Sequence, residues 1–152
     1  MRLLPMLLGL IFPACGYEGT GGLPSPVPIE MAGIERPATP NTYLAAPAGF
    51  PLTPDRITQA GADPGRLYAA LRTVVLAEAR VFLHGEFPAL RQLHVVARTE
   101  AANFPDLVMA AVTPEGGLVL WSRSVYGRKD FGANEARVTA WLADIARALP
   151  AN

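Results

Sequence analysis

The sequence predicts an α+β domain in which an antiparallel β-sheet, connected as a meander, is flanked by an N-terminal and a C-terminal helix and preceded by an extended Pro-rich arm. Apolar residues recur at helical spacing after Asp63 and again from Val138 to Leu149. Between these stretches, four short apolar runs are joined by connections too short for crossover helices, which favours antiparallel pairing. A chain of 152 residues, 51% of them hydrophobic, is sufficient for one domain with appendages.

Two helices follow from capping residues and apolar periodicity. The first is expected over residues 64–79, because Asp63 can cap free N–H groups and Pro64 suits the first helical position. The last is expected to begin near Asn134, a good capping residue, and to end at Pro150. The apolar stripes comprise Leu67, Leu71, Val74 and Val75 in the first helix, and Val138, Trp141, Leu142, Ile145 and Leu149 in the last, with Trp141 expected in the core.

The four strand candidates are residues 81–83, 93–99, 107–112 and 118–124. The first is expected to end at His84-Gly85, and residues 113–117 form a turn by composition. The last two strands carry apolar residues on both faces, which indicates a sheet that is covered on both sides. Helices are one expected cover, and the arm, a ligand or a second subunit could provide the other.

The segment before the first helix divides into two parts. Residues 15–34 are rich in glycine and proline and are expected to form a flexible tether. Residues 35–55 still contain prolines, which predict no regular element, but Tyr43, Leu44 and Phe50 are interspersed among them. Apolar side chains need a surface to lie on, so we expect an ordered arm packed across the domain. The single domain is therefore placed at residues 35–152.

The N-terminus predicts export. Arg2 precedes a short apolar run, and Phe12-Pro13-Ala14-Cys15 follows, so residues 1–14 are expected to be a signal peptide. A cysteine after a small residue resembles the lipobox of bacterial lipoproteins, which implies that lipid on Cys15 anchors the mature chain in a membrane. Gly16, where Asp would favour inner-membrane retention, points to an outer membrane facing the periplasm. An ordinary cleaved signal, giving a periplasmic or secreted protein, is the alternative.

Composition and motifs argue against several classes of function. With 13 basic and 13 acidic residues and no basic stripe with interleaved aromatics, we expect no nucleic-acid partner. Cys15 is the one cysteine, and the two histidines, His84 and His94, lack metal-site spacing, so we expect no metal. No phosphate loop or dinucleotide fingerprint occurs, so no cofactor is expected.

The densest polar stretch runs from Trp121 to Asn134 and is the principal candidate site. Cationic side chains near the start of the last helix could hold a phosphate, carboxylate or lipid headgroup. Alternatively, Arg123 or Arg128 pairs with Asp130, and these residues only fix the strand-to-helix turn. The candidate anion- or ligand-binding residues are Arg98, Ser122, Arg123, Ser124, Arg128, Lys129, Asp130 and Asn134.

The same stretch gives little support for catalysis. Ser122 or Ser124 could be combined with a histidine and with Asp106 or Asp130 into a triad, but no Gly-x-Ser-x-Gly motif accompanies them. We therefore expect no enzyme and no catalytic residue. The leading hypothesis is an envelope lipoprotein with a non-catalytic binding or assembly role and a protein partner. The alternative is a periplasmic binder of a small anionic molecule or lipid, with an apolar cavity and Arg98 or Arg123 as anchor, and a hydrolase ranks third.

One motif carries a resemblance to a known family. The run Ser-Arg-Ser, then Gly-Arg, then Asp-x-Gly-x-Asn over residues 122–134 resembles the signature of the bacterial domain of unknown function 1499 family. Residues 96–99 and 103–108, and Pro40-Asn41-Thr42 upstream, are similar to its pattern as well. The resemblance covers residues 35–149 and implies no activity. It does imply that the arm belongs to the domain, and many members look like envelope proteins.

Overall fold

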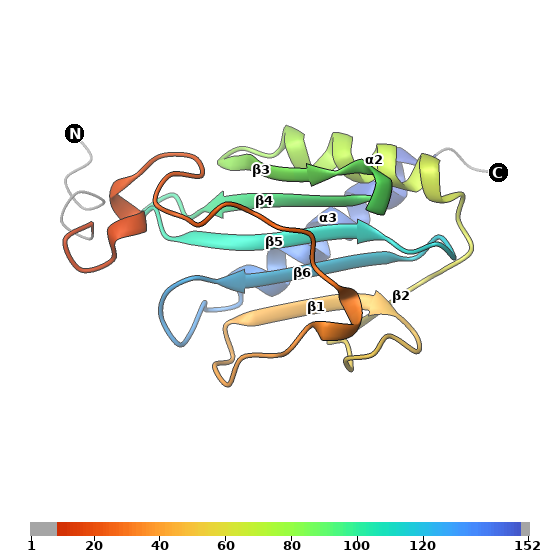
Figure 1. The fold of residues 1–152 in the computed structure, drawn as a ribbon, viewed down its shortest axis with the longest axis horizontal. Coiled ribbons are helices and arrows are strands. Elements are labelled where there is room, and N and C mark those ends of the chain that lie inside the picture. The colour runs from red at the N-terminus through yellow and green to blue at the C-terminus, as the bar shows by residue number, and fades with distance from the viewer. Residues whose placement is uncertain (1–8, 150–152) are drawn as a thin grey trace.

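The computed structural model describes residues 9–149, which form one six-stranded sheet with both helices on one face (Figure 1). The strand order is β2-β1-β6-β5-β4-β3. The strands are β1 (Thr42–Pro47), β2 (Arg56–Thr58), β3 (Val81–Phe87), β4 (Gln92–Arg98), β5 (Pro105–Val112) and β6 (Leu118–Ser124). The helices are α2 (Pro64–Ala77) and α3 (Ala133–Ala148), and short 3-10 turns cover Pro13–Gly16, Met31–Gly33 and Pro88–Leu90.

The antiparallel meander is confirmed for β3, β4, β5 and β6, each of which pairs with the next in antiparallel sense. The expectation that the arm forms no regular element is wrong. β1 lies within it and pairs antiparallel with β6, and β2 then pairs parallel with β1. The prolines at positions 40 and 47 flank a run whose N–H groups are free to join a ladder, so they delimit a strand here instead of preventing one.

The helices differ from expectation in place and in capping. Because β1 and β2 precede it, α2 is internal and not N-terminal. Its cap is as predicted, since Asp63 accepts a hydrogen bond from the Arg66 N–H at 2.8 Å. α3 begins at Ala133, and Gly132, in the left-handed conformation with φ 80°, occupies the cap position. Asn134 is therefore not the cap, and Pro150, expected to end this helix, lies outside the described residues.

The observed strand limits differ most from the predicted ones in β3, which continues beyond His84-Gly85 to Phe87. A bulge between Leu83 and Gly85 absorbs the irregularity, so the glycine does not end the strand. A Cβ at Gly85 would lie 2.5 Å from Cγ of Pro26, so this position requires glycine for close approach of the N-terminal segment.

The sheet is covered on both faces, as its apolar strands predict. On one face α2 and α3 pack onto the sheet, and Trp141 is a core residue, 2% exposed. On the other face a second cluster surrounds Leu44, Met109 and Trp121, with Phe50 of the arm packed against it. The arm therefore contributes one strand to the sheet and part of its second cover.

Residues 24–29, here called the strap, cross the sheet face opposite the helices (Figure 1). The side-chain amide of Gln92 donates to the Ile29 carbonyl at 2.8 Å, and its oxygen accepts the Ile29 N–H at 3.0 Å. The His84 Nε2 atom lies 2.9 Å from the Pro24 carbonyl oxygen. The segment expected as a free tether thus lies along the sheet, while the domain boundary at residue 35 stays a prediction.

Candidate functional site

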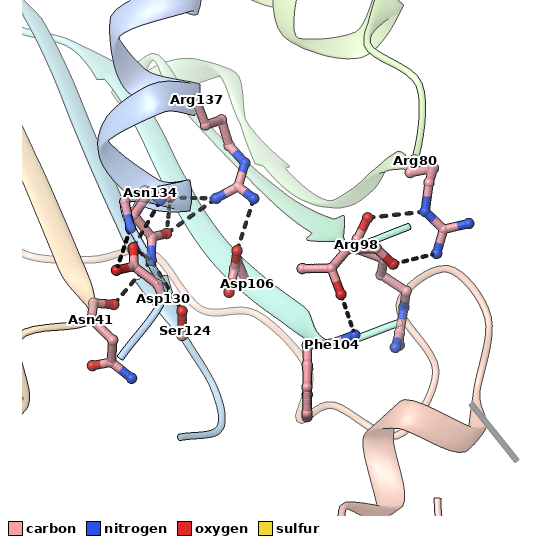
Figure 2. A network of polar contacts seen from close by, with 12 residues as sticks. Asn41, Arg80, Arg98, Phe104, Asp106, Ser124, Asp130, Asn134 and Arg137 are labelled. Atoms are coloured by element: carbon pink, nitrogen blue, oxygen red, sulfur yellow. Dashed lines mark hydrogen bonds and ion pairs between the residues drawn. The ribbon is translucent and has the colours of Figure 1, made fainter. Parts of the chain in front are cut away.

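A buried polar network joins the end of β6 to the start of α3 and is organised by Asn134 (Figure 2). Its side-chain oxygen accepts a hydrogen bond from the Ser122 hydroxyl at 2.6 Å. Its amide nitrogen lies 3.0 Å from the Asn41 carbonyl, 3.0 Å from the Ser124 hydroxyl and 2.8 Å from Asp130. Asn134 and Ser122 are fully buried. The side chain of Asn134 therefore links β1, β6 and α3 at one point.

Asp130 hydrogen-bonds to the main chain at the start of α3. Its carboxylate accepts the Gly132 N–H at 3.2 Å and the Asn134 N–H at 2.9 Å. Burial opposes ionisation, but the hydrogen bonds from Asn134 and Gly132 outweigh it and lower the pKa of Asp130 below its ordinary value. The expected pairing of Asp130 with Arg123 or Arg128 does not occur, because helix N–H groups already occupy this carboxylate.

Arg137 closes the network from α3 (Figure 2). Its guanidinium donates to the Ser122 hydroxyl at 3.0 Å and forms an ion pair with Asp106 on β5 at 2.8 Å. The Asp106 side chain is only 3% exposed. Burial raises the pKa of Asp106, and the nearby Arg137 only partly offsets this. The pair thus holds β5 to α3 beside the network.

Arg98 belongs to a different assembly, at the end of β4. Its guanidinium donates to the carbonyl oxygens of Ala14, Gly19 and Gly21 at 2.7, 2.7 and 3.0 Å. The Asn103 amide donates to the carbonyls of Cys15 and Tyr17 at 2.9 and 2.7 Å. We call Arg98 and Asn103 the carbonyl clamp. Arg80 supports it, because its guanidinium donates to the Asn103 side-chain oxygen at 2.7 Å. The same guanidinium also donates to the carbonyl oxygens of residues 98 and 99 (Figure 2).

Arg123 lies on the sheet face opposite Ser122 and Ser124, as strand alternation predicts. It lines a cleft of about 200 Å³ beneath the strap, here called the strap cleft, together with His84 and His94. Burial lowers the pKa of Arg123. Burial first, then the charges of Arg123 and His84, lower the pKa of His94 to about 4, so this imidazole is neutral near pH 7.

Arg128 and Lys129 are exposed on the loop before α3. Lys129 lines a second cavity of about 400 Å³, which also includes Phe12, Phe104 and Tyr126. The Phe12 ring lies 5.6 Å from the Phe104 ring and 5.0 Å from the Tyr126 ring, measured between centroids. The loop thus borders a cavity that a residue of the predicted signal peptide helps to line.

Cys15 and Ala14 are both buried in the structure, which describes the chain before any cleavage at this point. Its N–H donates to the Phe12 carbonyl at 2.8 Å. Burial raises the pKa of the thiol, and Arg98 opposes that rise. Cleavage after Ala14 would remove both Phe12 and Ala14, so these contacts describe an uncleaved N-terminus. Residues 1–8 of the predicted signal peptide lie outside the described residues.

The histidines of the conceivable triad contact other partners. The His84 Nε2 atom meets the Pro24 carbonyl, and the His94 Nε2 atom lies 3.2 Å from Gln92 Oε1. Across residues 9–149, no group of three or more His, Cys, Asp or Glu side chains gathers as a metal site. In the same part of the chain, no helix is both long and apolar enough to cross a membrane.

The structure therefore distributes the predicted site residues over four places. Ser122, Ser124, Asp130 and Asn134 come together, whereas Arg98 lies in the carbonyl clamp, Arg123 lines the strap cleft, and Arg128 and Lys129 are exposed on the loop before α3. Sequence reasoning did not assign Asn41, Arg80, Asn103 or Arg137 to the site, and it considered Asp106 as a possible triad acid. Two signals were present: position 137 follows Asn134 by one helical turn, and Asp106 is an acid directly before an apolar strand run.

The fold and site define an α+β domain whose strand-to-helix junction is closed by a buried network of Asn, Ser, Arg and Asp. A family model described as "Protein of unknown function (DUF1499)" matches residues 35–145, and the chain belongs to this family. The resemblance inferred from the motif is thereby confirmed. The signal peptide and lipid site lie outside the match and stay predictions. No curated protein and no solved structure matches the chain significantly.

Proposed function

We propose that this protein is a cell-envelope lipoprotein with a non-catalytic binding role, anchored by lipid on Cys15. The carbonyl clamp is the observation that carries the proposal. Arg98 and Asn103 donate to main-chain carbonyls from Ala14 to Gly21, the segment that begins at the predicted processing site. A partly buried guanidinium that donates to several carbonyls is a strong, charge-assisted attachment.

The clamp determines how an anchored domain would stand relative to the membrane. A free linker of about 20 residues would let the domain wander over roughly 20–30 Å, at about 5–6 Å times the square root of its length. With the clamp closed, the domain would instead be held within a few residues of the lipid. After cleavage, the contacts to the carbonyls of Cys15, Tyr17, Gly19 and Gly21 would remain available. The end of the sheet that carries the loops before β5 and α3 would then face the membrane.

A binding role agrees with how the polar candidates are used. Ser122 and Asn134 are buried within the network, and Asp130 accepts a main-chain N–H of the first turn of α3, so they serve structure at this junction. A small-molecule binder remains the second candidate, and one observation favours it: Arg123 lines the strap cleft. Arg98 is the weaker anchor for such a ligand because four carbonyls, including that of Asn103, already surround its guanidinium.

Anchoring is tested by expressing the full chain and Cys15→Ala in a two-membrane bacterial host, then measuring membrane partition and intact mass. We expect the native chain to be cleaved after Ala14, to carry lipid mass and to enter the outer-membrane fraction, and the variant to do none of these. Gly16→Asp is the matched variant for sorting and should move the lipidated protein to the inner membrane. Equal processing and solubility of the native chain and Cys15→Ala would refute the anchor and leave a periplasmic or secreted binder.

A further inference from the structure

The strap cleft combines three basic side chains with no acidic one among its described lining residues. Arg123, His84 and His94 line it, and the rest of the lining is mainly apolar, including Leu107, Met109 and Ile29. Arg123 is half-buried, and no hydrogen bond or ion pair involves its side chain within residues 9–149. Fully buried charges are normally paired, whereas this half-buried guanidinium has no protein partner within the described residues and so has donors available to bind an anion.

Other partly buried arginines of the chain show what such pairing looks like. Arg98 and Arg80 donate to main-chain carbonyls, and Arg137 meets the Asp106 carboxylate. Burial alone accounts for the lowered pKa of Arg123, with no neighbouring carboxylate to counter it. The electrostatic environment of the cleft is thus positive and uncompensated by protein groups.

Both histidines have fixed roles in the wall of the cleft. The Pro24 carbonyl can only accept, so His84 donates from Nε2 and holds the strap. Gln92 is oriented by its two hydrogen bonds with Ile29, which place its oxygen toward His94, so His94 also donates from Nε2. The neutral His94 adds no charge, and Arg123 supplies the permanent positive charge of the cleft.

We infer that the strap cleft binds a small monocarboxylate with a short apolar chain, its carboxylate on Arg123 and its chain along Leu107 and Met109. One permanent charge favours a monoanion over a dianion, and a planar guanidinium suits a carboxylate in two-point geometry. At about 200 Å³ the cleft is smaller than the roughly 300–1,000 Å³ of pockets for drug-sized ligands, which limits the ligand to a short chain and makes hexanoate a suitable probe.

This inference deepens the binding role of the proposed function by naming a ligand class. It does not depend on lipid, because the cleft is made of the strap and the sheet. Failure of lipid anchoring would therefore leave carboxylate binding possible, and failure of carboxylate binding would leave lipid anchoring possible.

The experiment titrates the full chain, purified without lipid, with hexanoate, acetate and hexanol, followed by NMR of backbone amides and of the Arg123 Nε–H. Hexanoate should bind saturably and shift the Arg123 signal together with amides of β5 and the strap. Acetate, which lacks the chain, and hexanol, which lacks the charge, should each bind at least about tenfold more weakly, since a charge-assisted hydrogen bond or a buried chain is worth that much.

Two variants make the result decisive. Arg123→Gln should weaken hexanoate binding about ten- to a hundredfold, while Arg128→Gln, an exposed arginine outside the cleft, should bind as the native chain does. The unliganded Arg123→Gln protein should unfold at the same or higher urea concentration than the native chain, because it loses an unpaired, half-buried charge. The inference is overturned if hexanoate shows no saturable binding up to 20 mM, a concentration about 10⁴-fold above a micromolar Kd. It is equally overturned if Arg123→Gln leaves hexanoate binding unchanged.

Discussion

Asn134→Ala tests whether the buried network holds the fold together. The substitution removes the amide that donates to the Asn41 carbonyl and accepts from the Ser122 hydroxyl. Both groups are buried, and each buried partner left unsatisfied costs about 1–3 kcal/mol. The Asn41 carbonyl keeps the Ser124 N–H, Ser122 keeps its hydrogen bond from Arg137, and Asp130 keeps its two from the main chain, so none is orphaned completely. The cost is instead that of several buried hydrogen bonds lost together, at about 0.5–1.5 kcal/mol each. The expected loss is therefore about 3 kcal/mol of unfolding free energy.

Urea unfolding of the native chain and Asn134→Ala measures this loss, provided that the denaturant slope m is the same for both. Thr139→Ala is the matched control, because Thr139 is exposed on the same helix and should change stability by less than about 0.5 kcal/mol. A loss below about 1 kcal/mol for Asn134→Ala would refute the reasoning, since it would mean that the junction satisfies its polar groups without this amide.

Three further expectations follow from other parts of the fold. Arg137→Met should lower the unfolding free energy by about 3 kcal/mol at pH 7, because it leaves the buried Asp106 carboxylate without its partner. The loss should be smaller at acidic pH, because burial raises the pKa of Asp106 and the protonated acid carries no charge that needs pairing; equal losses in urea at neutral and acidic pH would contradict this. The folded pKa of His94, about 4, lies below its ordinary 6.5, so between these pH values the unfolded chain binds a proton that the folded chain does not. Stability is therefore lost as the pH falls from 6.5 to 4, by up to roughly 3 kcal/mol at 1.36 kcal/mol per pKa unit. His94→Gln should flatten that part of the profile of stability against pH, and parallel profiles for the two proteins would argue against it. Gly116→Ala should lower stability by more than about 2 kcal/mol, because φ is 74° and a Cβ would lie 1.8 Å from the backbone oxygen of Ala62. Gly49→Ala is the control: with φ 82° and open space around it, it should cost only about 1 kcal/mol. Thermal melting measures both losses, and similar values would show that the contact with Ala62 is unimportant.

The core of the fold could be predicted because its signals are local. Apolar periodicity and a cap at Asp63 identified α2 and α3, and β6 was placed at its observed limits. The strand in the arm could not be predicted, because the prolines of the arm argue against a strand. The evidence for β1 lies instead in its partner β6, which is far away along the chain. A pairing decided by a distant partner leaves little trace in a sequence window.

The candidate site could be predicted as a group, but not as a set of contacts. Ser122, Ser124, Asp130 and Asn134 are close in sequence, and the turn between β6 and α3 brings them together. Arg123 faces the other side because side chains alternate along a strand. Arg137 was missed because its role depends on an acid of a neighbouring strand, which no local pattern reports.

The pairing of β1 with β6 also decides when the sheet can be completed. Thr42 lies opposite Arg123 and Leu44 opposite Trp121, so the strand that appears early in synthesis is joined by one that appears late. Such distant contacts carry a loop-closure cost and form slowly compared with hairpins. The hairpins of β3 to β6 can assemble first, and β1 adds to the free edge of β6 afterwards. Until then β1 lacks the strand that joins it to the rest of the sheet.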